Sequence, residues 1–341
     1  MPGKRDAAAR LLAGTGMLGI VAAIRSRFAR TVPILAYHRV LDVTDEDNYP
    51  FDVELISASV ASFAEQMAYV ARHHRPTTFA ALLDHLDNDR APPQGSIVVT
   101  FDDGFADNYH HAFPVLRQLG IPATIFLSTG YLDRQQMYWY EKLTHDVMTT
   151  RATQLRLLDE APLAIDDGAP SRRSALAVVL RRLKRVPNQV RLDCLADLER
   201  QLEPPADCNG DSRSGPMTWE HVAEMSRAGI EFGSHAVTHP VLSMLDPVDL
   251  DFELRASKAS IEAVTGKPCQ TIAYPVGGPH AFNPGVQQAA QAAGYRLGVT
   301  YMSGVDVPAD WDPFALHRLH VERYTDRHRF RAMLAAPGVF A

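Results

Sequence analysis

Two adjacent carboxylates, Asp102 and Asp103, follow the apolar run 96–101 (SIVVTF) and precede Gly104. Residues that leave a strand in succession point in different directions, so the two carboxylates can serve different tasks. One can bind a metal ion while the other accepts a proton from water. Asp-Asp-Gly is also favourable turn chemistry, so the pair alone leaves a purely structural turn open.

A pair of histidines, His235 and His239, lies in the segment SHAVTH after the predicted strand 230–233. Residues spaced i, i+4 share one face of a helix, so we expect one helical turn to present both imidazoles to one metal ion. With one aspartate they would supply three protein ligands and leave a position open for water, as a catalytic metal needs. Such a pair also arises by chance, so its place in the fold matters.

Two weaker candidates come later in the chain. The turn formed by Tyr274, Pro275 and Val276, followed by two glycines, can direct a backbone N–H toward an oxyanion. The alternative is a turn that simply ends a strand. His317 and His320 are candidate acids, and the alternative for them is a packing or surface role.

The segments around these residues alternate between short apolar runs and helical patterns. Strands are predicted at 32–37, 96–101, 123–127, 230–233, 271–274 and 295–301, and helices from Ser59 through Val70 and at 108–119, 218–228, 246–264 and 284–293. This alternation indicates parallel strands joined by helices, as in an α/β barrel or a doubly wound sheet. The carboxylates, the histidine pair and the Tyr274 turn then each follow a strand, where α/β barrels build their active sites.

One long segment, 133–216, interrupts the alternation. It begins with the aromatics Tyr138, Trp139 and Tyr140, continues through charged helical patterns, and ends in a loop rich in Pro, Asp, Gly and Ser. It is either an elaborated surface subdomain or a wall or lid over the substrate, whose aromatics would be exposed to stack on sugar rings.

The N-terminal segment, 1–30, combines basic residues with an apolar stretch at 11–24. That stretch is shorter than the roughly 18 residues needed to cross a bilayer. We interpret it as an amphipathic helix capable of peripheral membrane contact. A signal or anchor and a buried packing helix stay open as alternatives.

Composition excludes some classes of partner. The formal net charge of −6 provides no basic field for a phosphate backbone, so we expect no nucleic-acid partner.

Cys194, Cys208 and Cys269 form no CxxC pair and no even set, which mildly favours a reducing compartment. We expect a cytoplasmic location or the cytoplasmic membrane surface, with export as the alternative.

The motifs TFDDG (100–104), SHAVTH (234–239) and the YPVG turn (274–277) resemble those of polysaccharide deacetylases of the NodB-homology type, carbohydrate esterase family 4. The run ILAYHRV at 34–40 is similar to the start of members from exopolysaccharide loci. The resemblance covers residues 31–341 apart from the insertion. It implies a distorted (β/α)7 barrel with a helical insertion and hydrolysis of an N-acetylated carbohydrate.

The resemblance also implies roles for the candidate residues. Asp102 would be the general base, and Asp103, His235 and His239 would bind a divalent metal, Zn²⁺ or another ion such as Co²⁺. The Val276 N–H would share the oxyanion with the metal. His320 or His317 would protonate the departing amine.

Two positions depart from the family pattern. The third motif often begins with an arginine that orients the catalytic aspartate, but Ala273 occupies that position here. The usual C-terminal Leu-x-His is approached only by Arg318-Leu319-His320. Two other functions therefore stay open: a deacylase or deformylase acting on a lipid-linked or small amide, and a catalytically silent carbohydrate-binding barrel.

Overall fold

The computed structural model describes residues 31–158, 160–166, 168–203, 215–307 and 311–340, together with Ala9. The expected amphipathic segment 1–30 lies, Ala9 aside, outside the described residues, as does Cys208, so the amphipathic helix stays a prediction. Cys194 and Cys269 are free and buried. Within the described ranges, no helix is long and apolar enough to cross a membrane.

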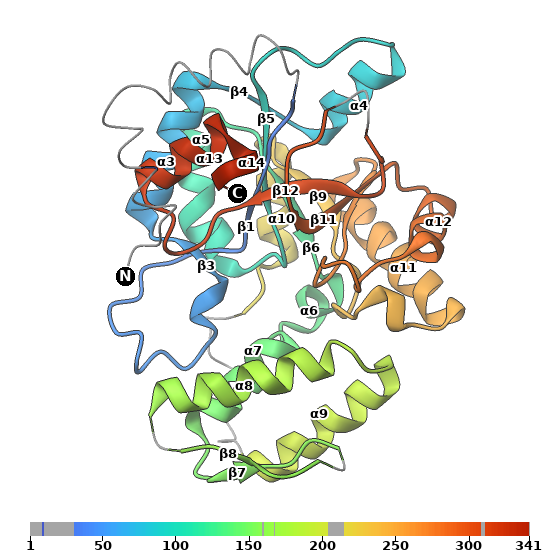
Figure 1. Ribbon diagram of the computed structural model, residues 1–341. Helices are drawn as coiled ribbons and strands as arrows, with labels where there is room; N and C mark the ends of the chain where they lie inside the picture. The colour runs from blue at the N-terminus through green and yellow to red at the C-terminus, as the bar shows by residue number, and fades with distance from the viewer. Residues whose placement is uncertain are drawn as a thin grey trace.

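Parallel strands close into a seven-stranded barrel within the described part of the chain (Figure 1). The order around the barrel is β1, β12, β11, β10, β9, β6 and β5, and β5 pairs with β1 to close it. Their bounds are Ile34–Tyr37 (β1), Ser96–Phe101 (β5), Thr124–Leu127 (β6), Glu231–Ser234 (β9), Thr271–Ala273 (β10), Leu297–Ser303 (β11) and Leu316–His320 (β12). This closed arrangement confirms the (β/α)7 barrel.

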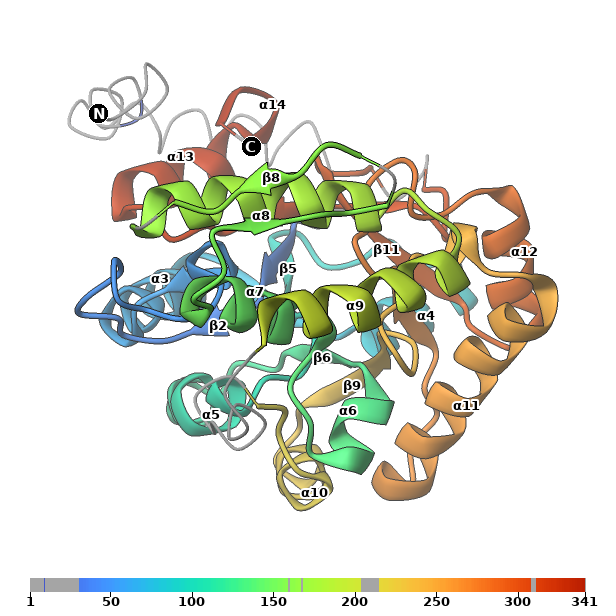
Figure 2. The same ribbon diagram turned by 90° about the horizontal axis from the view of Figure 1, so that it is seen from below.

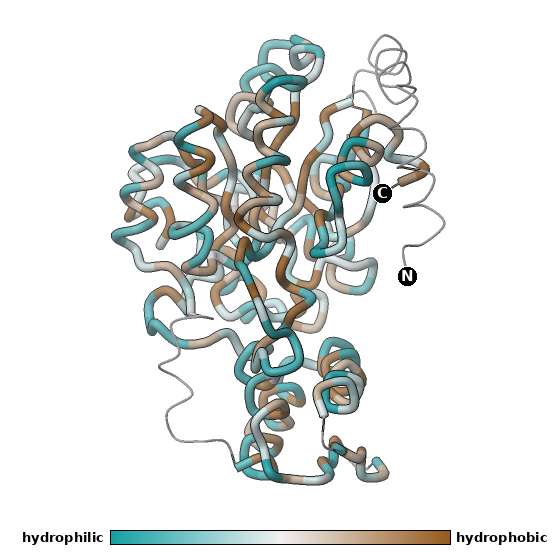
Figure 3. Tube along the Cα trace, turned by 90° about the vertical axis from the view of Figure 1, so that its left-hand side faces the viewer, coloured by the Kyte–Doolittle hydropathy of each residue, from teal (hydrophilic) through white to brown (hydrophobic). Residues whose placement is uncertain are grey.

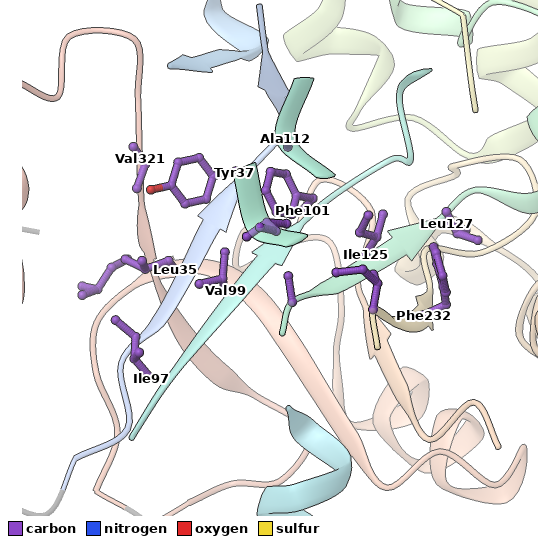
Figure 4. Packing of buried hydrophobic residues seen from close by; sticks show 14 of the residues in the cluster. Leu35, Tyr37, Ile97, Val99, Phe101, Ala112, Ile125, Leu127, Phe232 and Val321 are labelled. Atoms are coloured by element: carbon purple, nitrogen blue, oxygen red, sulfur yellow. The ribbon is translucent and has the colours of Figure 1, made fainter. Parts of the chain in front are cut away.

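Alternation along the strands separates two apolar layers. One set of side chains points outward against the helices, as Figure 4 shows for Leu35, Val99 and Ile125. The other set, which includes Val98, Phe126 and Val299, fills the inside of the barrel. Figure 3 shows hydrophobic segments running through the interior and hydrophilic turns outside. Both faces of β1, β5 and β6 are buried, which is why these three strands are almost wholly apolar.

Helices surround the barrel, and most of them begin at a capping side chain or end at a glycine. Asp246, for example, accepts hydrogen bonds from the backbone of the next helix, which ends at the left-handed Gly266. Their bounds are Val60–His73 (α3), Phe79–Asp87 (α4), Phe113–Leu119 (α5), Thr129–Arg134 (α6), Trp219–Arg227 (α10), Pro247–Thr265 (α11), Pro284–Ala292 (α12), Arg327–Ala335 (α13) and Pro337–Phe340 (α14).

Short elements complete the barrel. Strand β4 (Arg75–Thr77) pairs with the start of β5, and β2 (Arg39–Val40) pairs with β3 (Ile56–Ala58). Three short helical turns lie at η1 (Val53–Leu55), the π-helical η2 (Asn108–Ala112) and η5 (Leu242–Met244).

The insertion forms a helical unit beneath the barrel in Figure 1. It consists of α7 (Trp139–Thr149), the hairpin β7 (Gln154–Leu155) and β8 (Leu163–Ala164), α8 (Ala169–Leu183) and α9 (Asn188–Leu202). A separate apolar cluster, with Leu155, Leu176 and Leu198 among its members, holds these elements together. Seen from below, α8 and α9 lie across the barrel (Figure 2).

Buried charges fix the insertion to the barrel. Arg39, after the first barrel strand, pairs with Asp107 at 2.8 Å and with Glu141 of α7 at 3.0 Å. All three side chains are almost fully buried, and the Arg39 guanidinium also lies 4.5 Å from the centre of the Phe105 ring. The start of the insertion is therefore anchored next to the C-terminal ends of the strands.

Candidate active site

The two aspartates leave β5 in different directions because of backbone geometry. Asp102 continues the inward alternation of the strand, and its N–H donates to the Tyr37 carbonyl at 2.9 Å. Asp103 has a φ of 73°, in the left-handed region that few non-glycine residues adopt. Gly104 follows with φ 86°, and a Cβ there would lie 2.6 Å from Leu127 Cδ2. This strained turn directs the Asp103 carboxylate toward the loop after β9.

Asp103, His235 and His239 converge on one point. The Nε2 atoms of His235 and His239 lie 3.5 and 3.4 Å from Asp103 Oδ1. One ligand atom from each residue fits within 4.8 Å, and all three side chains are buried. Among the described residues this is the only such group of three or more His, Cys, Asp or Glu.

The donor set fits a divalent metal ion. Asp103 Oδ1 is buried without a hydrogen-bond partner among the described residues, an arrangement that a cation would relieve. Burial, and then the charge of Asp102, raise the pKa of Asp103 well above its ordinary value. Burial lowers the pKa of His235, and lowers that of His239 further, which keeps both imidazoles in the neutral form that binds metal. One carboxylate and two neutral imidazoles suit Zn²⁺ and related ions.

The histidines lie on a loop, so the expected helical turn is wrong. Ala236 and His239 both have positive φ values, 64° and 52°, which no helix contains. His235 Nδ1 lies 2.7 Å from the Ala273 carbonyl, which fixes the ring so that Nε2 faces Asp103. The chain between the histidines turns back on itself instead of continuing as a helix.

Glu253 of α11 holds this loop from outside the metal group. Its carboxylate accepts hydrogen bonds from the Val237 N–H at 2.6 Å, the Thr238 N–H at 3.0 Å and the Thr238 hydroxyl at 2.5 Å. The side chain is 5% exposed. The sequence analysis missed Glu253, because its distance along the chain from the motif gave no signal.

Asp102 forms a buried ion pair with Arg318 of β12. Both guanidinium NH groups reach the carboxylate at 2.7 Å, with Arg318 0% and Asp102 2% exposed. Burial alone would raise the pKa of Asp102, but the charge and hydrogen bonds of Arg318, with His235 and His38, hold it well below the ordinary value. Asp102 is therefore a buried carboxylate that Arg318 keeps ionised.

Two histidines lie beside Asp102. The His320 ring stacks on Tyr301, with centroids 3.7 Å apart, and its Nε2 is buried without a hydrogen-bond partner in the described chain. Burial, reinforced by the charge of Arg318, lowers the pKa of His320 to about 3. His38 Nε2 lies 3.9 Å from Asp102 Oδ2, and burial lowers its pKa to about 4. The sequence analysis missed His38, although it follows a barrel strand as Asp102 does.

The other expected site residues differ in placement. His317 is on the opposite face of β12 from Arg318, with Nδ1 2.8 Å from Asp306, so the structure does not bring it into the site. Tyr274 also points away: its hydroxyl donates to the Phe314 carbonyl and its ring stacks on Phe282. Its expected substrate contact does not fit this placement.

The turn after β10 nevertheless lies at the rim of the site. Pro275 is buried, Val276 has a φ of 67°, and Gly277 accepts a hydrogen bond from the Tyr301 N–H at 2.7 Å. Tyr301 in turn stacks on His320. Val276 makes no backbone hydrogen bond to any described residue, which leaves its N–H available as a donor.

The aromatics at the start of the insertion are largely buried, contrary to the expected exposed sugar-stacking surface. Tyr138 is 0% and Tyr140 7% exposed. The Tyr138 hydroxyl donates to the Asp103 carbonyl at 2.9 Å, and Trp139 Nε1 donates to the His239 carbonyl at 3.1 Å. These residues support the backbone of the metal ligands.

A model of the polysaccharide deacetylase family matches residues 89–298, which include the aspartates, both metal-site histidines and the turn after β10. The chain belongs to the polysaccharide deacetylase family. Membership agrees with the resemblance found in the motifs.

Two curated relatives are similar to parts of this chain. YxkH of Bacillus subtilis, named as a polysaccharide deacetylase, is 23% identical over 236 residues, 69% of this chain and 55% of the relative. A Staphylococcus aureus poly-β-1,6-N-acetyl-D-glucosamine N-deacetylase is 27% identical over 112 residues, 30% of this chain and 38% of the relative. The chain thus spans about half or less of the length of these relatives.

Several solved structures share the fold of this chain. The Streptococcus pyogenes deacetylase PplD, in complex with acetate, superposes with a TM-score of 0.59 at 19% identity, covering 87% of this chain and 95% of that one. IcaB from Ammonifex degensii gives a TM-score of 0.56 at 20% identity, covering 90% of this chain and 97% of that one. Both likenesses concern the fold alone.

Proposed function

We propose that this protein is a metal-dependent hydrolase that removes N-acetyl groups from a carbohydrate, and so acts on carbon–nitrogen bonds other than peptide bonds. One observation carries the proposal: the Asp103, His235 and His239 group lies beside a separate, ionised carboxylate, Asp102. A metal-binding group next to a base that binds no metal is the minimum equipment for hydrolysing an amide. Family membership supports the same reaction.

Each residue has a chemical task in this reaction. A divalent ion held by Asp103, His235 and His239 would polarise the acetamide carbonyl and lower the pKa of water. Asp102 accepts the proton of the attacking water, and Arg318 keeps the carboxylate oriented toward it. The Val276 N–H stabilises the oxyanion at the carbonyl oxygen.

The departing amine needs a proton when the carbon–nitrogen bond breaks. His320 is neutral in the free protein because burial lowers its pKa to about 3. The proton released by the attacking water therefore has to be passed on, and His38 and His320, both neighbours of Asp102, are the carriers. His320 then donates the proton to the amine nitrogen.

The name of one relative and a cleft beside the loops after β9 and β10 support a saccharide substrate. The Staphylococcus aureus relative is named as an N-deacetylase of poly-β-1,6-N-acetyl-D-glucosamine. In this chain a cleft of about 500 Å³ is lined by Arg185 of the insertion, by Ser243 and Met244 after β9, and by residues after β10: Pro279, His280, Phe282 and Asn283. Hydroxyl, amide and aromatic groups suit sugar residues next to the one that reacts, so we assign the cleft to an N-acetylated saccharide chain.

Acetate release from N-acetylated glycans tests the proposal. Metal-stripped protein should release no acetate, and stoichiometric Zn²⁺ or Co²⁺ should restore release. Failure of every metal to restore acetate release from a panel of glycans, despite stoichiometric binding, would contradict it. A lipid-linked formamide added to the panel would detect the deformylase alternative.

A further inference from the structure

A buried carboxylate that acts as a base requires a nearby cation that keeps it ionised and oriented. The resemblance to deacetylases implies that an arginine at the start of the third motif is this cation, but this chain has Ala273 there. Ala273 is fully buried and belongs to the apolar cluster inside the barrel, with Phe126 and Val299. Strand β10 therefore offers no charge to Asp102.

The charge comes from another strand. Arg318 is on β12, which pairs with β1, and β1 pairs with β5, the strand that ends at Asp102 (Figure 1). The guanidinium reaches across the inside of the barrel and holds both carboxylate oxygens at 2.7 Å. Its place is two strands away from the motif position on β10.

Further hydrogen bonds fix the guanidinium itself. Arg318 Nε donates to the Thr300 carbonyl at 2.7 Å, and one NH group donates to the Thr100 hydroxyl at 3.2 Å. Thr100 in turn donates to the Leu35 carbonyl at 2.7 Å. A planar guanidinium held on three sides allows one orientation of the carboxylate, which a lysine ammonium would not.

We propose that Arg318 is the positioning residue of the catalytic aspartate, and that this function has moved from the third motif on β10 to β12. The inference rests on the proposed function and names the residue that makes its base competent. It also explains how a chain with Ala273 at the motif position retains a guanidinium beside Asp102.

Arg318 and Ala273 both lie against the apolar cluster inside the barrel. Arg318 lies 5.9 Å from the centre of the Phe126 ring, which belongs to the same interior cluster as Ala273. Removing the long side chain from β12 opens space inside the barrel that an arginine at position 273 can enter. The two positions should therefore be exchangeable, but not both occupied.

The experiment compares Arg318→Lys, Arg318→Met, Ala273→Arg and the double variant Arg318→Met/Ala273→Arg in the full chain, loaded with Zn²⁺. Arg318→Lys keeps the positive charge but loses the two parallel N–H donors that hold both carboxylate oxygens. We therefore expect kcat to fall at least tenfold, with KM and bound metal unchanged. The double variant should recover at least tenfold in kcat over Arg318→Met. A control, Arg296→Met, removes an exposed arginine that binds Asp87 through two groups and should match the parent.

Thermal melting tests the exchange of the arginine between positions 318 and 273 without measuring turnover. Arg318→Met leaves Asp102 buried and unpaired, and Ala273→Arg adds a second guanidinium, so each single variant should melt below the parent. The double variant should melt above both. An Arg318→Lys protein with the parent's kcat, or a double variant that recovers neither kcat nor melting temperature, would overturn the inference. A parent protein that releases no acetate would count against the proposed function, and the melting comparison would still decide this inference.

Discussion

At the scale of single residues, the site divides its two aspartates by environment. Asp103 faces two neutral imidazoles and has a raised pKa, while Asp102 is held ionised by Arg318. The positive φ of Asp103 makes this division possible, because an extended residue would point outward from the barrel. Neighbouring residues of one type thus acquire separate tasks.

The identity of the proton donor is a residue-scale prediction. His320→Ala should lower kcat by roughly 10²-fold, in the range of general acid catalysis, with bound metal unchanged. His38→Ala should also lower kcat, because His38 is a carrier of the same proton. His317→Ala should behave as the parent, because His317 pairs with Asp306 on the outer side of β12. A full loss in His317→Ala with none in His320→Ala would contradict the assignment.

The sequence could predict the metal-site residues but not their support. Asp103, His235 and His239 stand out because they are polar groups of metal-binding type at the ends of apolar runs. Arg318 and Glu253 carry no such signal, because their roles depend on which strands and helices become neighbours in the barrel. His38 follows a strand and could have been found by the rule that found Asp102.

At the scale of elements, segments with a clear apolar pattern or cap could be predicted, and a polar strand could not. The run at 96–101 became β5 with the predicted bounds, and the Asp246 cap and Gly266 delimit α11 as expected. Strand β12 was not predicted, because LHRLH has polar side chains facing both inward and outward. A polar strand that closes a barrel is recognisable only from its neighbours, which supply partners for Arg318 and His317.

The loop that carries the histidines depends on α11. Replacing Glu253 by Gln removes the charge that binds the Val237 and Thr238 N–H groups. Since such supporting contacts are typically worth 10–100-fold in metal affinity, we expect Glu253→Gln to weaken Zn²⁺ binding by about tenfold or more. Asp251→Asn is the control, since Asp251 is exposed on the same helix and pairs with Arg255. Equal affinity in both variants would show that Glu253 does not hold the loop.

The insertion contributes one side of the cleft through the turn between α8 and α9. Arg185→Ala should raise KM for N-acetylated oligosaccharides about tenfold, because it removes a hydrogen-bond donor from the cleft lining, while a single N-acetylated sugar should be little affected. Arg181→Ala, on the exposed side of α8, is the matched control. The same KM change for single sugars and oligosaccharides would place Arg185 elsewhere in the reaction.

At the scale of the whole molecule, buried neutral histidines link stability to pH. The pKa values of His38 and His320 fall from 6.5 to about 4 and about 3 on folding, because burial disfavours the charged ring. Below pH 6.5 the unfolded chain binds protons that the folded protein does not, so the free energy of unfolding should fall as the pH drops from 6.5 toward 4.

Thermal melting between pH 7.5 and 4.5 measures this dependence. The melting temperature of the parent should fall across the interval, and His38→Gln/His320→Gln should show a shallower fall. His317→Gln, outside the barrel, should retain the parent's slope. A slope unchanged in the double variant would mean that other groups control the acid sensitivity.

The central claim is that one aspartate binds the metal and its neighbour performs the chemistry. Bound Zn²⁺ and acetate release, measured together for Asp103→Ala and Asp102→Asn on one N-acetylated oligosaccharide, test it most directly. We predict that Asp103→Ala loses both the metal and acetate release, whereas Asp102→Asn keeps stoichiometric metal and loses about 10²–10⁴-fold in kcat. An Asp102→Asn protein that binds metal and releases acetate at the parent's rate would contradict the account.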